Sequence, residues 1–334
     1  MRFDFNDEQG EIKGTAKQFI ASRFRPDKVR ELAEAGTYDD ALWVEVSELG
    51  WPGIAISEEY GGQGLGMVEL VVLCEELGFA CAPLPFLSNA AAGLAIEHAG
   101  SDEQKAAHLP GIASGEGRGA VGDEQIVLDG DGAASIVVFD QPGPILIAAG
   151  EAELEHLDLI DSSRRYSKLV SGAGEPLAGP VGPAADRVAV ALAAELVGIG
   201  QRAMEMAVEY AKEREQFGRP IGAYQGVSHI CAKMLYDIEE ARSLTYSAAW
   251  AADAEPGSLA IATCYACAAF GAMSGSSIAT TAIFGRLSLP EMQKYGYDTR
   301  LSVGCIASAG TFASMIPPST VSYTHLTLPT ILLV

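Results

Sequence analysis

Apolar residues recur at helical spacing through the first 115 positions of the chain. The pattern predicts four short amphipathic helices, at Glu8–Arg23, Tyr38–Leu49, Met67–Phe79 and Asn89–His98. Ser101 and Gln104 have the spacing of a capping box, which predicts the start of a further helix. We therefore expect a helical domain over residues 1–115.

A glycine-rich stretch, "YGGQGLG" at Tyr60–Gly66, precedes the helix that begins at Met67. Glycine-rich loops at helix starts bind phosphate in known motifs, but those motifs carry a following Lys-Ser/Thr pair or a preceding strand of a βαβ unit. This chain has neither feature. We interpret the stretch as a turn that leads into the helix.

The pattern changes over residues 116–182. Short β-like runs, "QIVLDG", "ASIVVFD" and "PILIAAG", are separated by Gly, Asp and Pro, and they predict a small β domain. From residue 183 helical periodicity returns over longer segments. One apolar stripe comprises Val188, Leu192, Leu196, Ile199, Ala203, Met206 and Tyr210.

A second stripe runs from Val227 to Leu244, and further helices are predicted at about Ser258–Phe284 and Pro290–Ala313. Four long helices with short connections predict an antiparallel bundle over residues 183–316. The expected fold class is mainly α with a small β domain. The apolar, Thr-rich tail, residues 317–334, has no helical period and resembles translated sequencing adapter, so we expect it to be non-native.

The net charge of −22 argues against nucleic acid or an anionic membrane as the main partner. The N-terminus lacks the apolar core of a signal peptide, and no apolar run reaches the roughly 18–20 residues of a membrane helix. Six scattered cysteines fit reduced thiols, so we expect a cytoplasmic protein. Cys264 and Cys267 form a CxxC without further ligands, and we expect no metal site.

The segment Glu213–Gln225, "EREQFGRPIGAYQ", stands between two helical patterns. Gly218 permits a turn and Pro220 ends the helix, so the chain turns a corner here. Arg214 is suited to bind phosphate oxygens through its planar fork of donors. The alternative interpretation is that Arg214 forms a salt bridge with a neighbouring Glu and that Phe217 fills the core.

This segment carries the most specific resemblance in the chain. Eleven positions match, in register, a motif of the acyl-CoA dehydrogenase family: Arg214, Gln216, Phe217, Gly218, Pro220, Ile221, Tyr224, Gln225, His229, Ala232 and Met234. Glu58–Gly66, Ser101–Glu116 and Glu240–Asp253 also resemble the family. The resemblance implies an FAD-dependent enzyme that desaturates an acyl-CoA thioester, with a helical domain, a β domain and a four-helix bundle.

The resemblance also implies roles for individual residues. In the family this corner grips the FAD of the neighbouring chain, and the residues that inherit the role are Arg214, Gln216, Phe217, Tyr224 and Gln225. His229 is expected to be a packed or capping residue. Arg187, near the start of the bundle, is the candidate contact for CoA.

Other family features are absent. The position of one family glutamate, the catalytic base, is occupied by Ala309, and Asp186 is the only carboxylate near the other known location of the base. The β domain is too short for the family's flavin motifs. In the third flavin motif, at Ala279–Leu287, only Gly285 is retained, and Ile283 would block a close backbone approach.

In lacking these catalytic and flavin-binding motifs, the chain resembles the shorter subunit of two-component actinobacterial acyl-CoA dehydrogenases. We therefore predict a subunit that shares FAD with an unlike partner, and that partner would supply the base. Assembly with further copies of the same chain stays open. Two alternatives are a flavin-free scaffold subunit and an autonomous enzyme with an unrecognised base.

Overall fold

The computed structural model describes residues 5–123, 125–139 and 143–254. The chain divides into two compact units, residues 1–192 and 193–334, and each is described by itself. This division places the N-terminal helices and the β strands in one unit. The predicted boundaries at residues 115 and 182 stay predictions.

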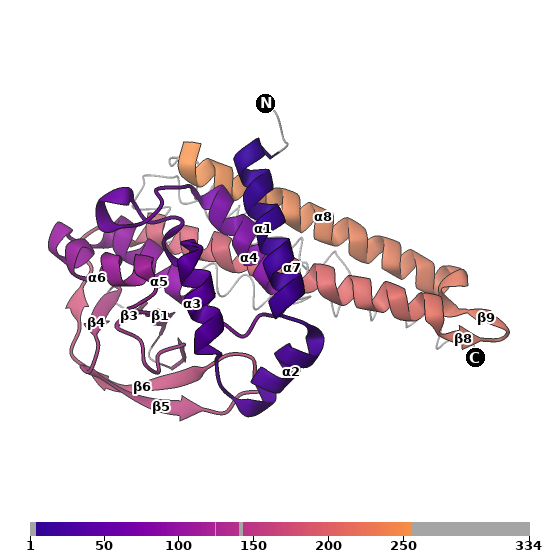
Figure 1. Cartoon of the computed structure of the whole chain (residues 1–334), viewed down its shortest axis with the longest axis horizontal. Coiled ribbons are helices and arrows are strands. Elements are labelled where there is room, and N and C mark those ends of the chain that lie inside the picture. Colours follow the sequence, from indigo (N-terminus) through magenta and orange to yellow (C-terminus); the bar gives the residue numbers. More distant parts are fainter. Residues whose placement is uncertain (1–4, 124, 140–142, 255–334) are drawn as a thin grey trace, which may run out of the picture. The chain divides into compact units, whose positions relative to one another are not determined.

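The first unit begins with six α-helices and two short 3-10 turns (Figure 1). These are α1 (Asp7–Arg23), α2 (Pro26–Ala35), α3 (Asp40–Glu48), η1 (Trp51–Gly53), η2 (Glu58–Tyr60), α4 (Met67–Phe79), α5 (Phe86–Ala99) and α6 (Asp102–Ser114). The four predicted helices are confirmed, although α5 begins three residues before the predicted start. Helix α2 was not predicted.

The start of α6 is capped as predicted. The Gln104 amide donates to the Ser101 hydroxyl at 3.2 Å, and the Ser101 amide donates to the Gln104 side-chain oxygen at 3.0 Å. This reciprocal pair satisfies two of the amides that a helix start leaves without an internal acceptor.

The glycine loop before α4 uses its amides internally. The backbone amides of residues 61–65 donate to carbonyls of residues 53–58 at 2.8–3.1 Å, and the Gly66 amide donates to the Glu69 carboxylate at 3.0 Å. No amide of the loop is left to bind a phosphate. The prediction of a turn into a helix is confirmed.

Seven short strands follow and form one sheet in the order β5-β6-β2-β1-β3-β4-β7. Their bounds are β1 (Gly119–Gly122), β2 (Val127–Leu128), β3 (Ser135–Val138), β4 (Ile145–Ala148), β5 (Ala152–Leu157), β6 (Tyr166–Gly172) and β7 (Glu175–Pro176). Strands β1 and β3 are parallel, and every other pair is antiparallel. The three predicted β runs contain β2, β3 and β4.

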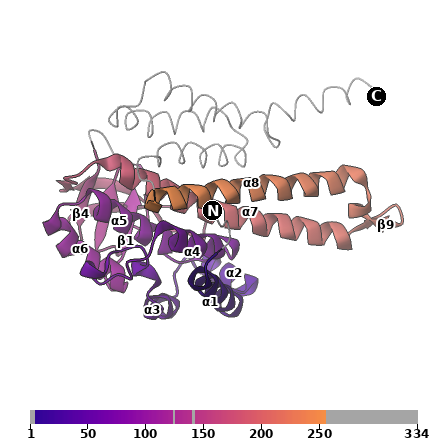
Figure 2. The same ribbon diagram turned by 90° about the horizontal axis from the view of Figure 1, so that it is seen from above.

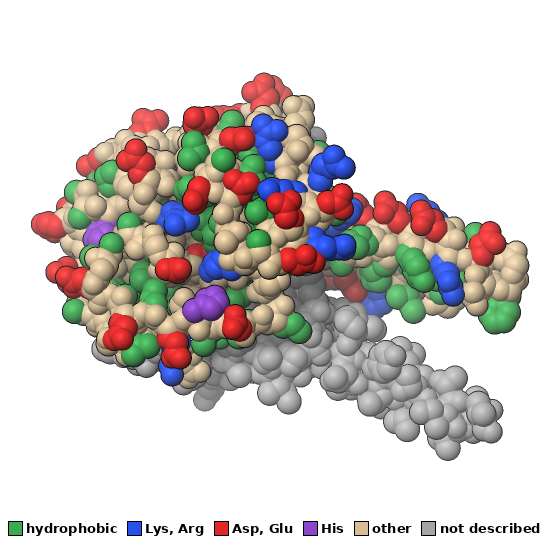
Figure 3. All heavy atoms as spheres, turned by 60° about the horizontal axis from the view of Figure 1, so that its bottom comes forward, with side chains coloured by type: hydrophobic (Ala, Val, Ile, Leu, Met, Phe, Trp, Pro, Cys, Tyr) green, Lys and Arg blue, Asp and Glu red, His purple; other side chains and the backbone are tan. Residues whose placement is uncertain are grey.

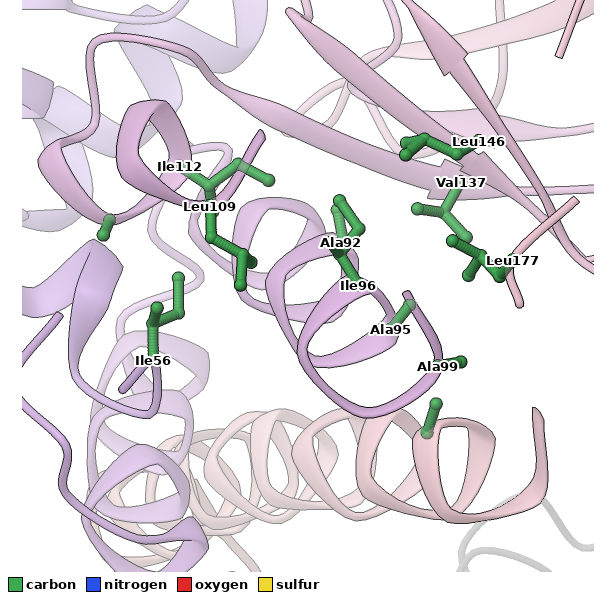
Figure 4. Packing of buried hydrophobic residues seen from close by; sticks show 12 residues of the cluster. Ile56, Ala92, Ala95, Ile96, Ala99, Leu109, Ile112, Val137, Leu146 and Leu177 are labelled. Carbon is green, nitrogen blue, oxygen red and sulfur yellow. The ribbon is translucent and has the colours of Figure 1, made fainter. Parts of the chain in front are cut away.

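The centre of the sheet is apolar on both faces, because β3 is buried at each of its four positions. Val137 and Leu146 belong to one apolar cluster with Ile96 of α5 and with Leu109 and Ile112 of α6, and Figure 4 shows α5 between the strand residues and the α6 residues. Ile136 and Ile147 point to the opposite face. Burying one such side chain contributes roughly 2 kcal/mol, so this alternation fixes the strand register.

The second unit contains the end of α7 (Val181–Glu213), the strands β8 (Glu215–Gln216) and β9 (Arg219–Pro220), the turn η3 (Ile221–Ala223) and α8 (Gln225–Ala254). Helices α7 and α8 run side by side (Figure 2). Val197, Met204, Ile238 and Ala241 form the core between them.

The predicted stripe on α7 is not the face that packs against α8. Ile199, Met206 and Tyr210 are 38%, 54% and 59% exposed, whereas Val197 and Met204 are buried. Helix α7 carries apolar residues on two faces, and the predicted stripe did not specify which helix it would contact. The helices predicted at about 258–284 and 290–313, like the tail, lie outside the described residues.

The described surface is acidic in character. Figure 3 shows Asp and Glu side chains spread over much of the visible face, with Lys and Arg interspersed among them. None of the helices in the described part of the chain combines the length and apolar character that a membrane span requires.

Candidate cofactor-binding corner

The corner between α7 and α8 is a two-residue β-hairpin. Glu215 pairs with Pro220 and Gln216 pairs with Arg219. The turn residues Phe217 and Gly218 have φ values of 55° and 79°. Positive φ at both turn positions is the signature of a type I′ turn, whose twist matches that of the strands.

Phe217 is an unusual residue for this turn. Its side chain is 93% exposed. A bulky residue at positive φ is an outlier that costs about 1 kcal/mol, and Asn or Gly would occupy the position without that cost. The interpretation of Phe217 as a core residue is therefore wrong. Residues held in strained backbone conformations cluster at functional sites.

Arg214 is exposed and follows the last residue of α7. Its amide donates to the Tyr210 carbonyl at 2.8 Å, which continues the helical hydrogen bonding. Its guanidinium forms no ion pair with any residue that the structure describes, including the adjacent Glu213 and Glu215. The alternative interpretation, a local salt bridge, is therefore wrong.

Tyr224 organises the base of the hairpin. Its hydroxyl donates to the Gln216 carbonyl at 2.9 Å. The Phe217 ring meets the Tyr224 ring edge-on, with 6.4 Å between the centroids, and the Arg219 guanidinium lies 4.1 Å from the Tyr224 centroid. The structure thus places Gln216, Phe217 and Tyr224 in contact, and Arg214 lies two residues before Gln216 in the same corner. It adds Arg219, which the sequence interpretation left out.

Two further residues of the motif lie near the hairpin. Gln225 is exposed at the first residue of α8, next to the hairpin. His229 is also exposed, and its side chain forms no hydrogen bond with a described residue, so the prediction of a packed or capping histidine is wrong.

Beside the hairpin lies a cavity of about 300 Å³. It is lined by residues from the end of α7, from η3 and from the start of α8: Val208, Ala211, Lys212, Pro220, Gly222, Ala223, Ser228 and Cys231. Gly222 is required here, since a Cβ at this position would lie 3.0 Å from the Ala211 carbonyl oxygen. The close approach of η3 to α7 holds the corner in place.

The residues predicted for the base and for CoA lie in the first unit. Asp186 and Arg187 are 8% and 7% exposed, and the Arg187 guanidinium donates to the Pro183 carbonyl at 3.0 Å. Burial and the positive charge of Arg187 lower the pKa of His98 to about 4. The roles of Asp186 as the catalytic base and of Arg187 as the CoA contact stay predictions. Ala309, Gly285, Cys264 and Cys267 lie outside the described residues.

A second polar cluster, which the sequence did not predict, surrounds Asp129. The Ser88 hydroxyl donates to one carboxylate oxygen at 2.6 Å, and the Tyr38 hydroxyl donates to the other. Burial raises the pKa of Asp129, and the positive charge of Arg164 opposes that rise. The Asp129 amide donates to the Arg165 carbonyl at 2.8 Å.

This Asp129 network joins the helices to the sheet, since Tyr38 precedes α3, Ser88 lies on α5 and Asp129 follows β2. Asp129 itself is only 4% exposed. Buried polar groups whose partners all come from the protein stabilise a fold and leave no donor for a ligand. In the described ranges no three His, Cys, Asp or Glu side chains gather closely enough to hold a metal ion.

Comparison with known proteins agrees with this architecture. The model of the acyl-CoA dehydrogenase N-terminal domain matches residues 6–116. Acyl-CoA dehydrogenase IpdE2 of Mycobacterium tuberculosis is 35% identical over 245 residues, which cover 72% of this chain and 76% of that protein. The chain belongs to the acyl-CoA dehydrogenase family.

Solved structures of this oxidoreductase family share the fold. A variant of the Tcur3481–Tcur3483 steroid acyl-CoA dehydrogenase superposes with a TM-score of 0.70 at 26% identity, and 98% of each chain is covered. The ChsE4–ChsE5 complex of Mycobacterium tuberculosis superposes with a TM-score of 0.70 at 22% identity over 94% of each chain. The expected fold, mainly α with a small β domain, is confirmed.

A further family model matches the C-terminal part. It is the DctM component of the tripartite ATP-independent periplasmic transporter, and it matches residues 234–331. Only residues 234–254 of that range are described, and they belong to α8, which carries charged residues such as Asp237, Glu240 and Arg242.

Proposed function

We propose that this chain is a subunit of an acyl-CoA dehydrogenase that shares FAD with an unlike subunit. When bound, FAD supplies the oxidant for α,β-desaturation of an acyl-CoA thioester. The unlike subunit supplies the base, because Ala309 stands where one family glutamate would be. A methyl group cannot accept the proton.

The corner residues fit one side of a dinucleotide. Arg214 presents an exposed guanidinium that is suited to bidentate binding of phosphate oxygens. Phe217 and Tyr224 offer aromatic surface, and the Gln216 and Gln225 side chains carry amides for hydrogen bonding. The single observation that carries the proposal is the exposed Arg214, without a carboxylate partner among the described residues, beside the exposed Phe217.

The names of two related structures support an unlike partner. The Tcur3481–Tcur3483 steroid enzyme and the ChsE4–ChsE5 assembly each carry two component names. By analogy, the substrate here is an acyl-CoA thioester. Arg187 is the residue that we propose for the CoA side.

Purification of the chain alone and together with an unlike acyl-CoA dehydrogenase subunit tests the proposal. We expect flavin absorbance and acyl-CoA-dependent dye reduction only in the co-purified complex. Arg214→Ala should weaken FAD binding about 10- to 100-fold, since a hydrogen bond to a charged group contributes about 1.5–3 kcal/mol. Arg30→Ala, which removes another exposed arginine, is the matched control.

Each other outcome has a defined meaning. Flavin bound to the single chain, with full activity, would overturn the sharing of FAD. A complex whose flavin content and activity ignore Arg214→Ala would instead identify a scaffold subunit.

A further inference from the structure

We infer that Arg219 is a second anion-binding residue of the corner and acts with Arg214 on the diphosphate group of FAD. The inference rests on the proposed function. It concerns a residue that the inherited motif leaves variable.

The hairpin register places the relevant side chains on one face. Gln216 and Arg219 are direct cross-strand partners, and side chains of such partners project from the same face of an antiparallel ladder. Arg214 precedes Gln216 by two residues, and the Ile221 amide donates to the Arg214 carbonyl at 2.8 Å, which extends the pairing. Arg214, Gln216 and Arg219 therefore share a face.

The nearest carboxylate in the hairpin points elsewhere. Glu215 pairs with Pro220 and, because side chains alternate along a strand, projects from the opposite face. Arg219 is exposed and forms no ion pair with any described residue. Two guanidinium groups without carboxylates lie on one face of an acidic protein, which makes a site for a multiply charged anion.

Tyr224 holds the Arg219 guanidinium in place before an anion binds. The guanidinium stacks on the Tyr224 ring at 4.1 Å, and the Tyr224 hydroxyl is fixed by its bond to the Gln216 carbonyl at 2.9 Å. Stacking occupies the flat face of the guanidinium and leaves its in-plane N–H donors for an anion. Less side-chain freedom is then lost when the anion binds.

Titration of the flavin-free heteromeric complex with FAD, followed by flavin fluorescence, tests the inference. We expect Arg219→Gln to raise the Kd for FAD about 10-fold and to make binding less dependent on salt. Arg219→Lys keeps the charge but loses the planar fork, so its Kd should lie between those of the wild type and Arg219→Gln. ADP should compete with FAD in the wild type, and this competition should weaken in Arg219→Gln.

Variants of Tyr224 separate positioning from hydrogen bonding. Tyr224→Phe keeps the stacking surface and should bind FAD better than Tyr224→Leu, which removes that surface. Circular dichroism checks that each variant is folded, and Arg30→Gln controls for the loss of one positive charge.

The inference and the proposed function fail differently. If Arg214→Ala loses FAD while Arg219→Gln binds it like the wild type, the inference is overturned and the proposed function stands. If the wild-type complex binds no FAD, the proposed function falls and the inference falls with it.

Discussion

The Asp129 network and the corner at Arg214 place their polar side chains in opposite environments. Around Asp129, hydroxyls and a carboxylate are buried and satisfy one another. At the corner, Arg214 and Arg219 are exposed, and neither forms an ion pair within the described residues. The first arrangement completes itself within the fold, whereas the second leaves charge available for a ligand.

The difference shows how a network that stabilises the fold is distinguished from a candidate binding site. A buried polar group must find its partners in the protein, because leaving it unsatisfied costs roughly 1–3 kcal/mol. An exposed arginine has no such requirement, since water hydrates it. Its availability is informative here because the strained, exposed Phe217 adjoins it.

The largest expected effect is at Asp129. Asp129→Ala leaves the Ser88 and Tyr38 hydroxyls without their buried acceptor and should lower the free energy of unfolding by about 3 kcal/mol. Denaturant unfolding followed by circular dichroism measures the change. Asp131→Ala, an exposed aspartate two residues away, should change stability little. If both variants lost the same free energy of unfolding, the Asp129 network would not be a stabilising element of the fold.

A second prediction in the first unit concerns the pH dependence of stability, through the half-buried His98. The folded-state pKa of His98 is lowered to about 4, so the unfolded chain binds the proton more tightly than the native one. The contribution of neutral His98 to the free energy of unfolding is fully present above the unfolded-state pKa of about 6.5, and it is lost as the pH falls towards 4.

Between about pH 7.5 and pH 5.5 the loss should reach about 1.4 kcal/mol. His98→Gln should remove this part of the pH dependence, as measured by thermal unfolding across that range. His156→Gln, at an exposed histidine, should leave the dependence intact. A His98→Gln profile that matches the wild type would contradict the burial of this group.

At the exposed corner near Arg214, the substitution Phe217→Asn should stabilise the isolated chain. Asn tolerates positive φ and creates the Asn-Gly pair that type I′ turns prefer, so a gain of about 1 kcal/mol is expected. Phe217→Ala keeps a Cβ at positive φ and loses the same ring contact, so it should not gain. If thermal unfolding finds the two variants equally stable, Phe217 stores no strain.

The smallest effect is expected at Arg214. Arg214→Ala should change the free energy of unfolding by less than about 0.5 kcal/mol, because no described residue pairs with its guanidinium. Arg23→Ala is a useful contrast, since Arg23 pairs with Glu45 at 2.7 Å. A clear loss of stability in Arg214→Ala would show that the corner arginine has a structural partner.

Most helices and the location of the corner could be predicted from local pattern. Periodicity, the capping box at Ser101 and the fixed spacing around Arg214 are all written in short stretches of chain. Helix α2 was also predictable, since Pro26 stands at its first turn and Gly36, with φ of 66°, follows its end.

Three features could not be predicted from the sequence, and two of them depend on residues far apart in it. Asp129 meets Tyr38 and Ser88 across 91 and 41 positions, and no local pattern encodes that meeting. The choice between the two apolar faces of α7 required the position of α8. The role of Arg219 required the hairpin register and its stacking on Tyr224.

The family, the fold class and the location of the corner at Arg214 could thus be inferred from local sequence patterns, because capping, periodicity and motif spacing act over a few residues. Burial, pairing and exposure required the packed chain, because they depend on which distant side chains become neighbours. Arg214 is the clearest case. Its identity and spacing pointed to phosphate, and its exposed guanidinium, without a carboxylate among the described residues, supports that interpretation over a local salt bridge.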